Sequence, residues 1–241
     1  MMNQPEHEQE QAGGQASRLS WPTGFQPVVS LADRRDALSA MTGGTPVLHG
    51  LVLAGGRSSR MGRDKAALVH PDGRTLARRC HDLLAGAGCQ QIMLSLRHDQ
   101  QLPPGFADLP QVALVRDPAG LSCGPLAGMI AAMRLRPEAD WLVLACDLPR
   151  LDLSTLTHLV AARHPDEPLL AYRSEFDGLP EPLCAIYAAA ALPLLEQAMR
   201  DGVRCPRKLL IRQACRLLYP LIPRALDNAN TPEDWLTANT P

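Results

Sequence analysis

The sequence of 241 residues contains little of what several large classes of protein depend on. It has 24 Lys and Arg against 25 Asp and Glu, so it lacks the basic surplus typical of nucleic-acid binding. Aromatic residues make up only 4% of the chain, which argues against a surface on which bases stack. No apolar run is long enough to span a bilayer. We therefore expect neither nucleic acid nor a membrane among the partners.

Paired cysteines are also missing. The seven cysteines are an odd number without any C-x-x-C spacing, which argues against a zinc site or a disulfide framework. We expect reduced, mostly buried thiols, as in a cytoplasmic protein. Residues 1–20 are polar and lack the apolar segment of a secretory signal, which favours the same location.

The composition changes near residue 47. Residues 1–46 are rich in Gln, Glu, Gly, Ser and Pro and have little periodicity, which predicts a disordered N-terminal extension. A docking arm is the functional alternative for this segment. Residues 47–241 alternate apolar runs with amphipathic stretches and contain enough hydrophobic residues for one sizeable core.

Strands and helices are expected to alternate through residues 47–241. The predicted strands are 47–53, 92–96, 112–115, 141–145, 169–172, 185–187 and 216–221, and the predicted helices are 75–87, 125–134, 152–163, 188–200, 206–214 and a last one from 231. This alternation predicts a three-layer α/β/α domain with a mostly parallel sheet. Ligands of such sheets bind at the carboxyl ends of strands, which directs attention to the loop after Leu53 and to Asp147.

A glycine-rich loop with hydroxyl groups and cations follows the first strand. Residues 53–65 have the sequence L-A-G-G-R-S-S-R-M-G-R-D-K. Gly55 and Gly56 allow the backbone to approach a ligand closely, while Arg60 and Lys65 add positive charge. A triphosphate requires this combination of many donors and a few cations. The alternative is an ordinary turn with surface charges.

Two better-known glycine motifs do not fit this loop. The P-loop requires G-x-x-x-x-G-K-[ST], but Gly62 is followed by Arg63 and Asp64. The dinucleotide fingerprint G-x-G-x-x-G is absent after this strand. The sequence therefore argues against P-loop kinases and Rossmann dehydrogenases.

The loop resembles the signature L-A-G-G-x-S-x-R-M-G-x-D-K of the molybdenum cofactor guanylyltransferases. The resemblance continues at Asp117, at 124–128 (G-P-L-A-G), at 146–149 (C-D-L-P) and at 228–234 (N-A-N-T-P-E-D), and it covers residues 48–238. It implies a Rossmann-like sheet of the GT-A-like nucleotidyltransferase type. It also implies GTP as donor, molybdopterin or molybdenum cofactor as acceptor, Mg²⁺ as cofactor, and molybdoenzyme maturation proteins as candidate partners.

The resemblance also assigns roles to individual residues. Contacts with the nucleotide are implied for Leu53, Ala54, Gly55, Gly56, Arg60, Lys65, Asp117 and Asp147. Lys65 would act on the phosphates, and Asp147 would bind magnesium. The family can place a nucleotide-contacting Asn on the second strand, but residues 94–97 of this chain are Leu-Ser-Leu-Arg.

The chemistry of magnesium independently favours Asp147. This ion prefers hard oxygen ligands and keeps waters, so one carboxylate and the substrate phosphates suffice. A helix cap is the alternative for Asp147, although Asp152 is better placed for that role. Asn228 and Asn230 precede Thr-Pro-Glu, a typical helix start, so capping and contact with the metal or acceptor both stay open. Asn230 is the preferred substrate-binding candidate, and residues 173–187 are expected to border the acceptor pocket.

The implied reaction is attack of an acceptor phosphate oxygen on the α-phosphorus of GTP, with loss of pyrophosphate. Such a transfer depends on positioning and charge neutralisation rather than on a protein nucleophile. Cytidylyl transfer to the same pterin is the nearest alternative, and sugar-phosphate nucleotidyl transfer is a more distant one. A non-catalytic carrier is an alternative of another class, but it has less need of Lys65 and Asp147.

Overall fold

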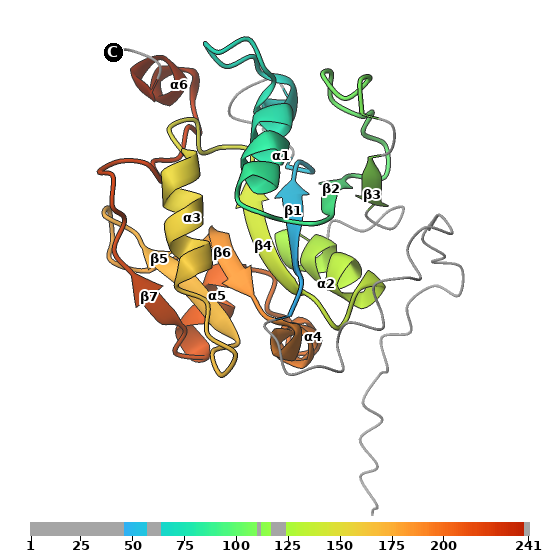
Figure 1. Cartoon of the computed structure of the whole chain (residues 1–241), viewed down its shortest axis with the longest axis vertical. Helices are drawn as coiled ribbons and strands as arrows, with labels where there is room; N and C mark the ends of the chain where they lie inside the picture. Colours follow the sequence, from blue (N-terminus) through green and yellow to red (C-terminus); the bar gives the residue numbers. More distant parts are fainter. Residues whose placement is uncertain (1–45, 57–63, 110–111, 117–123, 239–241) are drawn as a thin grey trace, which may run out of the picture.

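The computed structural model describes residues 46–56, 64–109, 112–116 and 124–238, which form a seven-stranded sheet (Figure 1). Its strands are β1 (Leu48–Leu53), β2 (Ile92–Leu96), β3 (Ala113–Arg116), β4 (Asp140–Ala145), β5 (Leu169–Arg173), β6 (Pro180–Tyr187) and β7 (Arg216–Leu218). They lie in the order β3-β2-β1-β4-β6-β5-β7. Only β6 runs antiparallel to its neighbours, so the predicted mostly parallel sheet is confirmed.

Helices cover both faces of this sheet. They are α1 (Leu76–Gly86), α2 (Pro125–Leu135), α3 (Leu153–Ala161), α4 (Leu192–Arg200), α5 (Pro206–Arg212) and α6 (Pro232–Ala238), with short 3₁₀ turns η3 (Lys65–Ala67) and η4 (Ala189–Ala191). Helices α1 and α3 share one hydrophobic cluster with the sheet, whereas α2, α4 and α5 share another. Val52 belongs to the first cluster and Leu51 to the second, as the alternation of side chains along a strand requires. The predicted three-layer arrangement is therefore confirmed.

Proline and capping residues set several helix starts, as the sequence predicts. Pro125 and Pro206 occupy the first turns of α2 and α5. Pro193 restarts the helical segment of residues 188–200, because η4 ends at Ala191 and α4 follows directly. Asp152 caps α3, since its side chain accepts a hydrogen bond of 2.8 Å from the backbone N–H of Thr155.

Strand β6 is longer than the sequence predicts, since it begins at Pro180 and not at residue 185. The structure places Pro180 and Pro182 inside the strand, next to a register shift in β5 between Ala171 and Tyr172. Pairing with β4 begins only at Cys184. The prolines therefore lie where the ladder is irregular or one-sided, and a missing N–H is tolerated there.

A glycine allows helix α2 to lie close to strand β2. A Cβ at Gly128 would overlap the Oγ of Ser95 and would lie 3.2 Å from the Ser95 Cβ. Ser95 is buried, so relieving this overlap requires its hydroxyl to change rotamer or the helix to shift within a packed interior. This close approach gives a structural reason for the last glycine of the G-P-L-A-G motif.

Gly128→Ala is expected to lower the free energy of unfolding by about 1–3 kcal/mol, because it overpacks this contact. Denaturant unfolding measures the change. Gly86→Ala is a matched control in helix α1. Its Cβ would lie 3.0 Å from a methyl group of Leu153, a partly exposed side chain that can turn away. The control should be neutral or stabilised, and equal losses in both variants would contradict the packing argument.

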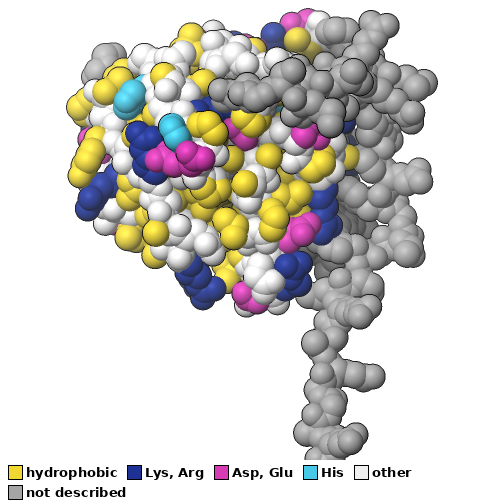
Figure 2. Space-filling view, turned by 60° about the horizontal axis from the view of Figure 1, so that its bottom comes forward, with side chains coloured by type: hydrophobic (Ala, Val, Ile, Leu, Met, Phe, Trp, Pro, Cys, Tyr) yellow, Lys and Arg dark blue, Asp and Glu magenta, His cyan; other side chains and the backbone are white. Residues whose placement is uncertain are grey.

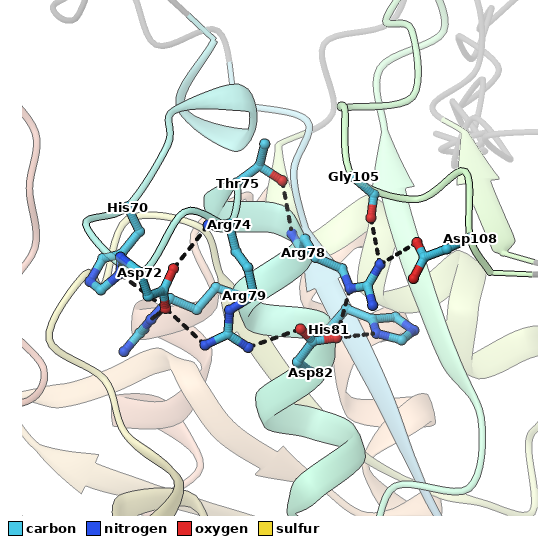
Figure 3. A network of polar contacts seen from close by, with 10 residues as sticks. All are labelled: His70, Asp72, Arg74, Thr75, Arg78, Arg79, His81, Asp82, Gly105 and Asp108. Atoms are coloured by element: carbon cyan, nitrogen blue, oxygen red, sulfur yellow. Dashed lines mark hydrogen bonds and ion pairs between the residues drawn. The ribbon is translucent and has the colours of Figure 1, made fainter.

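A polar network fixes the start of helix α1 (Figure 3). Thr75 caps the helix, and its hydroxyl donates to the carbonyl of Pro104 at 2.8 Å. About two turns on, Asp82 accepts hydrogen bonds from Arg74 at 2.9 Å and from Arg78 at 2.8 Å. Arg78 also donates to the Gly105 carbonyl and to Asp108, so together with Thr75 it holds α1 against the segment that follows β2.

The surface agrees with the balanced charge of the sequence. On the face shown in Figure 2, Lys and Arg side chains are interspersed with Asp and Glu instead of forming a continuous basic band. Four of the free cysteines in the described residues are buried, as expected: Cys80, Cys89, Cys146 and Cys184. None of the helices within the described ranges combines the length and apolar character needed to cross a membrane.

Candidate functional site

The carboxyl ends of β1, β2 and β4 meet at one edge of the sheet. These strands are parallel neighbours, and Leu53 at the end of β1 pairs with Ser95 of β2 and Ala145 of β4. The glycine-rich segment leaves β1 at Ala54, and Asp147 follows β4 after a single residue. Both features singled out in the sequence therefore lie at the edge where α/β sheets bind ligands.

Three predicted site residues from distant parts of the chain meet at this edge. Lys65 Nζ donates to the side-chain oxygen of Asn230 at 2.7 Å and lies 3.7 Å from Asp147 Oδ2. The backbone reinforces the contact, because Ala229 N–H donates to the Asp147 carbonyl at 2.8 Å. The segment before α6 is thus held against the end of β4, and Lys65 lies between the two.

The Asp147 carboxylate is largely buried, although a carboxylate at the ligand-binding edge of the sheet is expected to face solvent. Only 24% of the side chain is exposed, and Oδ1 is buried without a hydrogen-bond partner in the described structure. Burial raises the pKa of the Asp147 carboxyl above its ordinary value, although the neighbouring Lys65 ammonium opposes this rise. A buried carboxylate oxygen is energetically costly unless a hydrogen-bond donor or a cation binds it.

This oxygen fits the expected magnesium. Nowhere in the described ranges do three or more His, Cys, Asp or Glu side chains gather as a ready metal site. Asp147 would therefore supply one carboxylate and leave the remaining positions to phosphate oxygens and waters, an arrangement common for Mg²⁺.

The Asn230 side chain takes no part in capping helix α6, although its backbone N–H donates to Asp234 Oδ2 at 2.9 Å. Thr231 and Asp234 cap α6 reciprocally: Asp234 N–H donates to Thr231 Oγ1 at 3.1 Å, and Asp234 Oδ2 accepts from Thr231 N–H at 2.9 Å. The Asn230 side chain instead accepts from Lys65. Of the two alternatives, its side chain is thus available for a site role, and Asn228 lines the adjoining cavity.

The segment after β2 contains a residue that the sequence did not single out. Arg97 Nη1 donates to the carbonyls of Gly55 at 3.1 Å and Gly56 at 2.9 Å. The fully buried Leu96 precedes it. The signal for Arg97 was its place directly after a strand at the ligand-binding edge. The candidates Arg60 and Asp117 lie outside the described residues.

A cavity of about 600 Å³ reaches this cluster through Asn230, which is one of its lining residues. Its walls come from residues 174–181, residues 224–230 and helix α6, and Asn230 belongs to both the cavity and the Lys65 contact. Arg207 lines the cavity and donates to two other lining residues, Asp177 at 2.7 Å and Glu181 at 3.0 Å. The predicted acceptor-bordering segment 173–187 thus lines the cavity in its first half, whereas its second half is interior strand β6.

The chain is similar in sequence to proteins of molybdenum cofactor biosynthesis. Over 205 residues the chain is 34% identical to a molybdenum cofactor guanylyltransferase of Pseudomonas fluorescens, covering 83% of this chain and 98% of that relative. It is 36% identical over 188 residues to a molybdenum cofactor biosynthesis bifunctional protein of Synechocystis sp., covering 78% of this chain. The match spans 52%, or about half, of that longer protein.

A solved structure shows the same fold. It is the molybdopterin-guanine dinucleotide biosynthesis protein A from Archaeoglobus fulgidus, with a TM-score of 0.61 and 25% identity over 79% of this chain and 96% of that one. Residues 50–216 match the family model described as the MobA-like NTP transferase domain. With most of its length matched, the chain belongs to the MobA-like NTP transferase family.

Proposed function

We propose that this protein transfers GMP from GTP to molybdopterin or the molybdenum cofactor, releases pyrophosphate and forms the guanine dinucleotide cofactor. The observation that carries the proposal is the meeting of Lys65, Asp147 and Asn230 between the glycine-rich segment and the cavity. The names of the Pseudomonas and Archaeoglobus relatives support guanylyl transfer in particular.

The chemistry divides between the two sides of this cluster. On the glycine side, Leu53 to Gly56 would approach the nucleotide and Lys65 would neutralise its phosphates, with Arg60 and Asp117 as further candidates. On the cavity side, Asn230 would contact the acceptor. The acceptor phosphate oxygen then attacks the α-phosphorus, the bond to pyrophosphate breaks, and no covalent intermediate with the protein is required.

Magnesium is part of the proposal, with Asp147 Oδ1 as its protein ligand. Bound there, the ion would neutralise charge on the triphosphate and orient its oxygens. The support is the buried, unpartnered oxygen at the ligand-binding edge. Lys65 Nζ, 3.7 Å from the other oxygen of the carboxylate, would add a second positive charge on the same side.

The cavity suits a small-molecule acceptor. Its volume of about 600 Å³ falls within the range of roughly 300–1,000 Å³ typical of ligand pockets. Its walls carry several polar side chains, including Ser174, Asn228 and Asp234, which offer both donors and acceptors. A pterin presents such groups along its edge. The product would pass to molybdoenzyme maturation proteins in the cytoplasm.

A carrier function explains the site less well. A protein that only held the finished dinucleotide would have less need of a buried carboxylate oxygen placed to bind a cation beside Lys65. Cytidylyl transfer keeps every contact described so far and differs only in the base. A comparison of GTP with CTP therefore distinguishes these two reactions.

Titration calorimetry with GTP, CTP, ATP and UTP, each with magnesium, is expected to show the tightest binding for GTP. Release of pyrophosphate should then require both GTP and the pterin acceptor. Tighter binding of CTP would replace the donor while keeping the reaction class. Binding of the dinucleotide product without turnover of any triphosphate would favour the carrier.

A further inference from the structure

The segment after β2 touches both ends of the glycine-rich segment through one side chain. Gln100 is buried, with 6% exposure. Its Nε2 donates to the carbonyl of Ala54 at 2.9 Å and to Asp64 Oδ2 at 2.7 Å. A single amide therefore links the residue before the glycines to the residue before Lys65.

The amide of Gln100 is fixed in one orientation by its neighbours. Its Oε1 accepts from the backbone N–H of Arg97 at 3.2 Å, so both ends of the amide are engaged. Arg116 then holds the backbone of this segment, donating to the carbonyls of Arg97 at 3.1 Å and Gln100 at 2.7 Å. Gln100 is thus held in place by contacts that exist before any ligand binds.

Asp64 connects Gln100 to the turn that carries Lys65. Its Oδ1 accepts from the backbone N–H of Ala66 at 3.0 Å and caps the turn η3, which begins at Lys65. Its Oδ2 is the oxygen that Gln100 contacts. Each carboxylate oxygen has its own partner, so the turn is fixed relative to β2, and with it the position from which Lys65 extends.

Arg97 acts on the other end of the segment. It holds the carbonyls of Gly55 and Gly56. Since the C=O and N–H of a trans peptide point in opposite directions, holding the Gly55 carbonyl turns the Gly56 N–H away from Arg97. A Cβ at Gly55 would lie 3.3 Å from the Arg97 backbone nitrogen, so this approach favours glycine.

We propose that Gln100, assisted by Arg97, is a positioning residue for the nucleoside triphosphate. It joins Ala54 to Asp64, so that the glycine backbone and Lys65 are arranged for the phosphates before the nucleotide arrives. Arrangement in advance reduces the ordering cost of binding. The inference rests on the proposed function for the identity of the ligand, and it adds a residue that lies outside the glycine signature.

Gln100→Met keeps the length of the side chain and removes its hydrogen bonds. We expect the GTP affinity measured by calorimetry to fall roughly tenfold, because Ala54 and Asp64 lose the donor that joins them. The melting temperature should fall as well, since the buried Ala54 carbonyl loses its donor, but the KM for the pterin acceptor should change little. Gln101→Met is the matched control at the exposed neighbouring position, and its GTP affinity should be unchanged.

A second pair of variants distinguishes positioning from general stability. Gln100→Glu places a carboxylate against Asp64 and the Ala54 carbonyl, and should weaken GTP binding more than Gln100→Met. Adding Asp64→Asn returns a donor to this contact while its oxygen can still cap Ala66, and should restore part of the GTP affinity.

Three results would overturn the role of Gln100. They are unchanged GTP affinity in Gln100→Met, equal losses for GTP and acceptor, and no recovery in the double variant. A wild-type protein that binds no triphosphate would instead overturn the proposed function, so the two failures are distinguishable.

Discussion

Asp147→Asn is expected to lower turnover by roughly two to three orders of magnitude, because it removes the charge that would hold magnesium against the phosphates. The substitution keeps the size and one oxygen, so the site geometry is preserved. Asn is a weaker ligand, and the magnesium concentration for half-maximal rate should rise. Initial rates measured against magnesium concentration, for both proteins, test this expectation.

Asp152→Asn is the matched control. It makes the same chemical change five positions later, where the side chain caps α3 at 2.8 Å from Thr155 N–H. Asn caps a helix nearly as well as Asp, so the rate and the magnesium profile should match wild type. A near-wild-type magnesium curve for Asp147→Asn would remove Asp147 from the metal site.

Stability gives an independent measurement of the same residue. Burial raises the pKa of Asp147 in the folded protein, so its ionised form is disfavoured by folding. The stability associated with the protonated Asp147 carboxyl is complete below the pKa of the unfolded state and is lost as the pH rises through the higher pKa of the folded state. Asparagine does not ionise, so Asp147→Asn does not lose stability in this pH range. In metal-free buffer its melting temperature should therefore rise relative to wild type as the pH increases towards neutrality, while its activity is lost.

The location of the site could be predicted from sequence because it follows from strand order. Lys65 and Asp147 each come shortly after an apolar strand, and parallel strands end at a common edge. Asn230 was harder, since Asn before Thr-Pro-Glu suits a cap as well as a ligand. Only the contacts of Thr231 with Asp234 and of Asn230 with Lys65 separate these two roles.

Strand order marks only the position of Arg97, directly after β2, and it does not mark Gln100, so the contacts of these two residues could not be predicted in this way. Their partners are mainly backbone carbonyls, which every sequence offers, so no pattern of residue types marks the contacts. The length of β6 was missed for a related reason. Proline argues against a strand only where its N–H is needed, and the register of pairing decides that. The disordered extension at 1–46 lies almost wholly outside the described residues and stays a prediction.

Lys65→Ala is expected to weaken GTP binding by about 1.5–3 kcal/mol, the usual value of a hydrogen bond to a charged group. The acceptor should be affected less, because it presents no triphosphate to the glycine-rich segment. Lys208→Ala is the matched control, since it removes the same charge from an exposed position on α5. Calorimetry with GTP measures all three proteins, and GTP affinity equal to that of the control would return Lys65 to an ordinary surface charge.

The 2.7 Å contact between Lys65 and Asn230 makes a stronger test possible. If Asn230 serves the nucleotide only by holding Lys65, then Asn230→Ala should weaken GTP binding less than Lys65→Ala, and the double variant should resemble Lys65→Ala. Groups that act through each other give non-additive losses in such a cycle. Asn230→Ala should also raise the KM for the acceptor, because Asn230 lines the cavity as well. Strictly additive losses in GTP affinity would mean that Asn230 does not act through Lys65. An unchanged KM for the acceptor would mean that Asn230 does not contact the acceptor either.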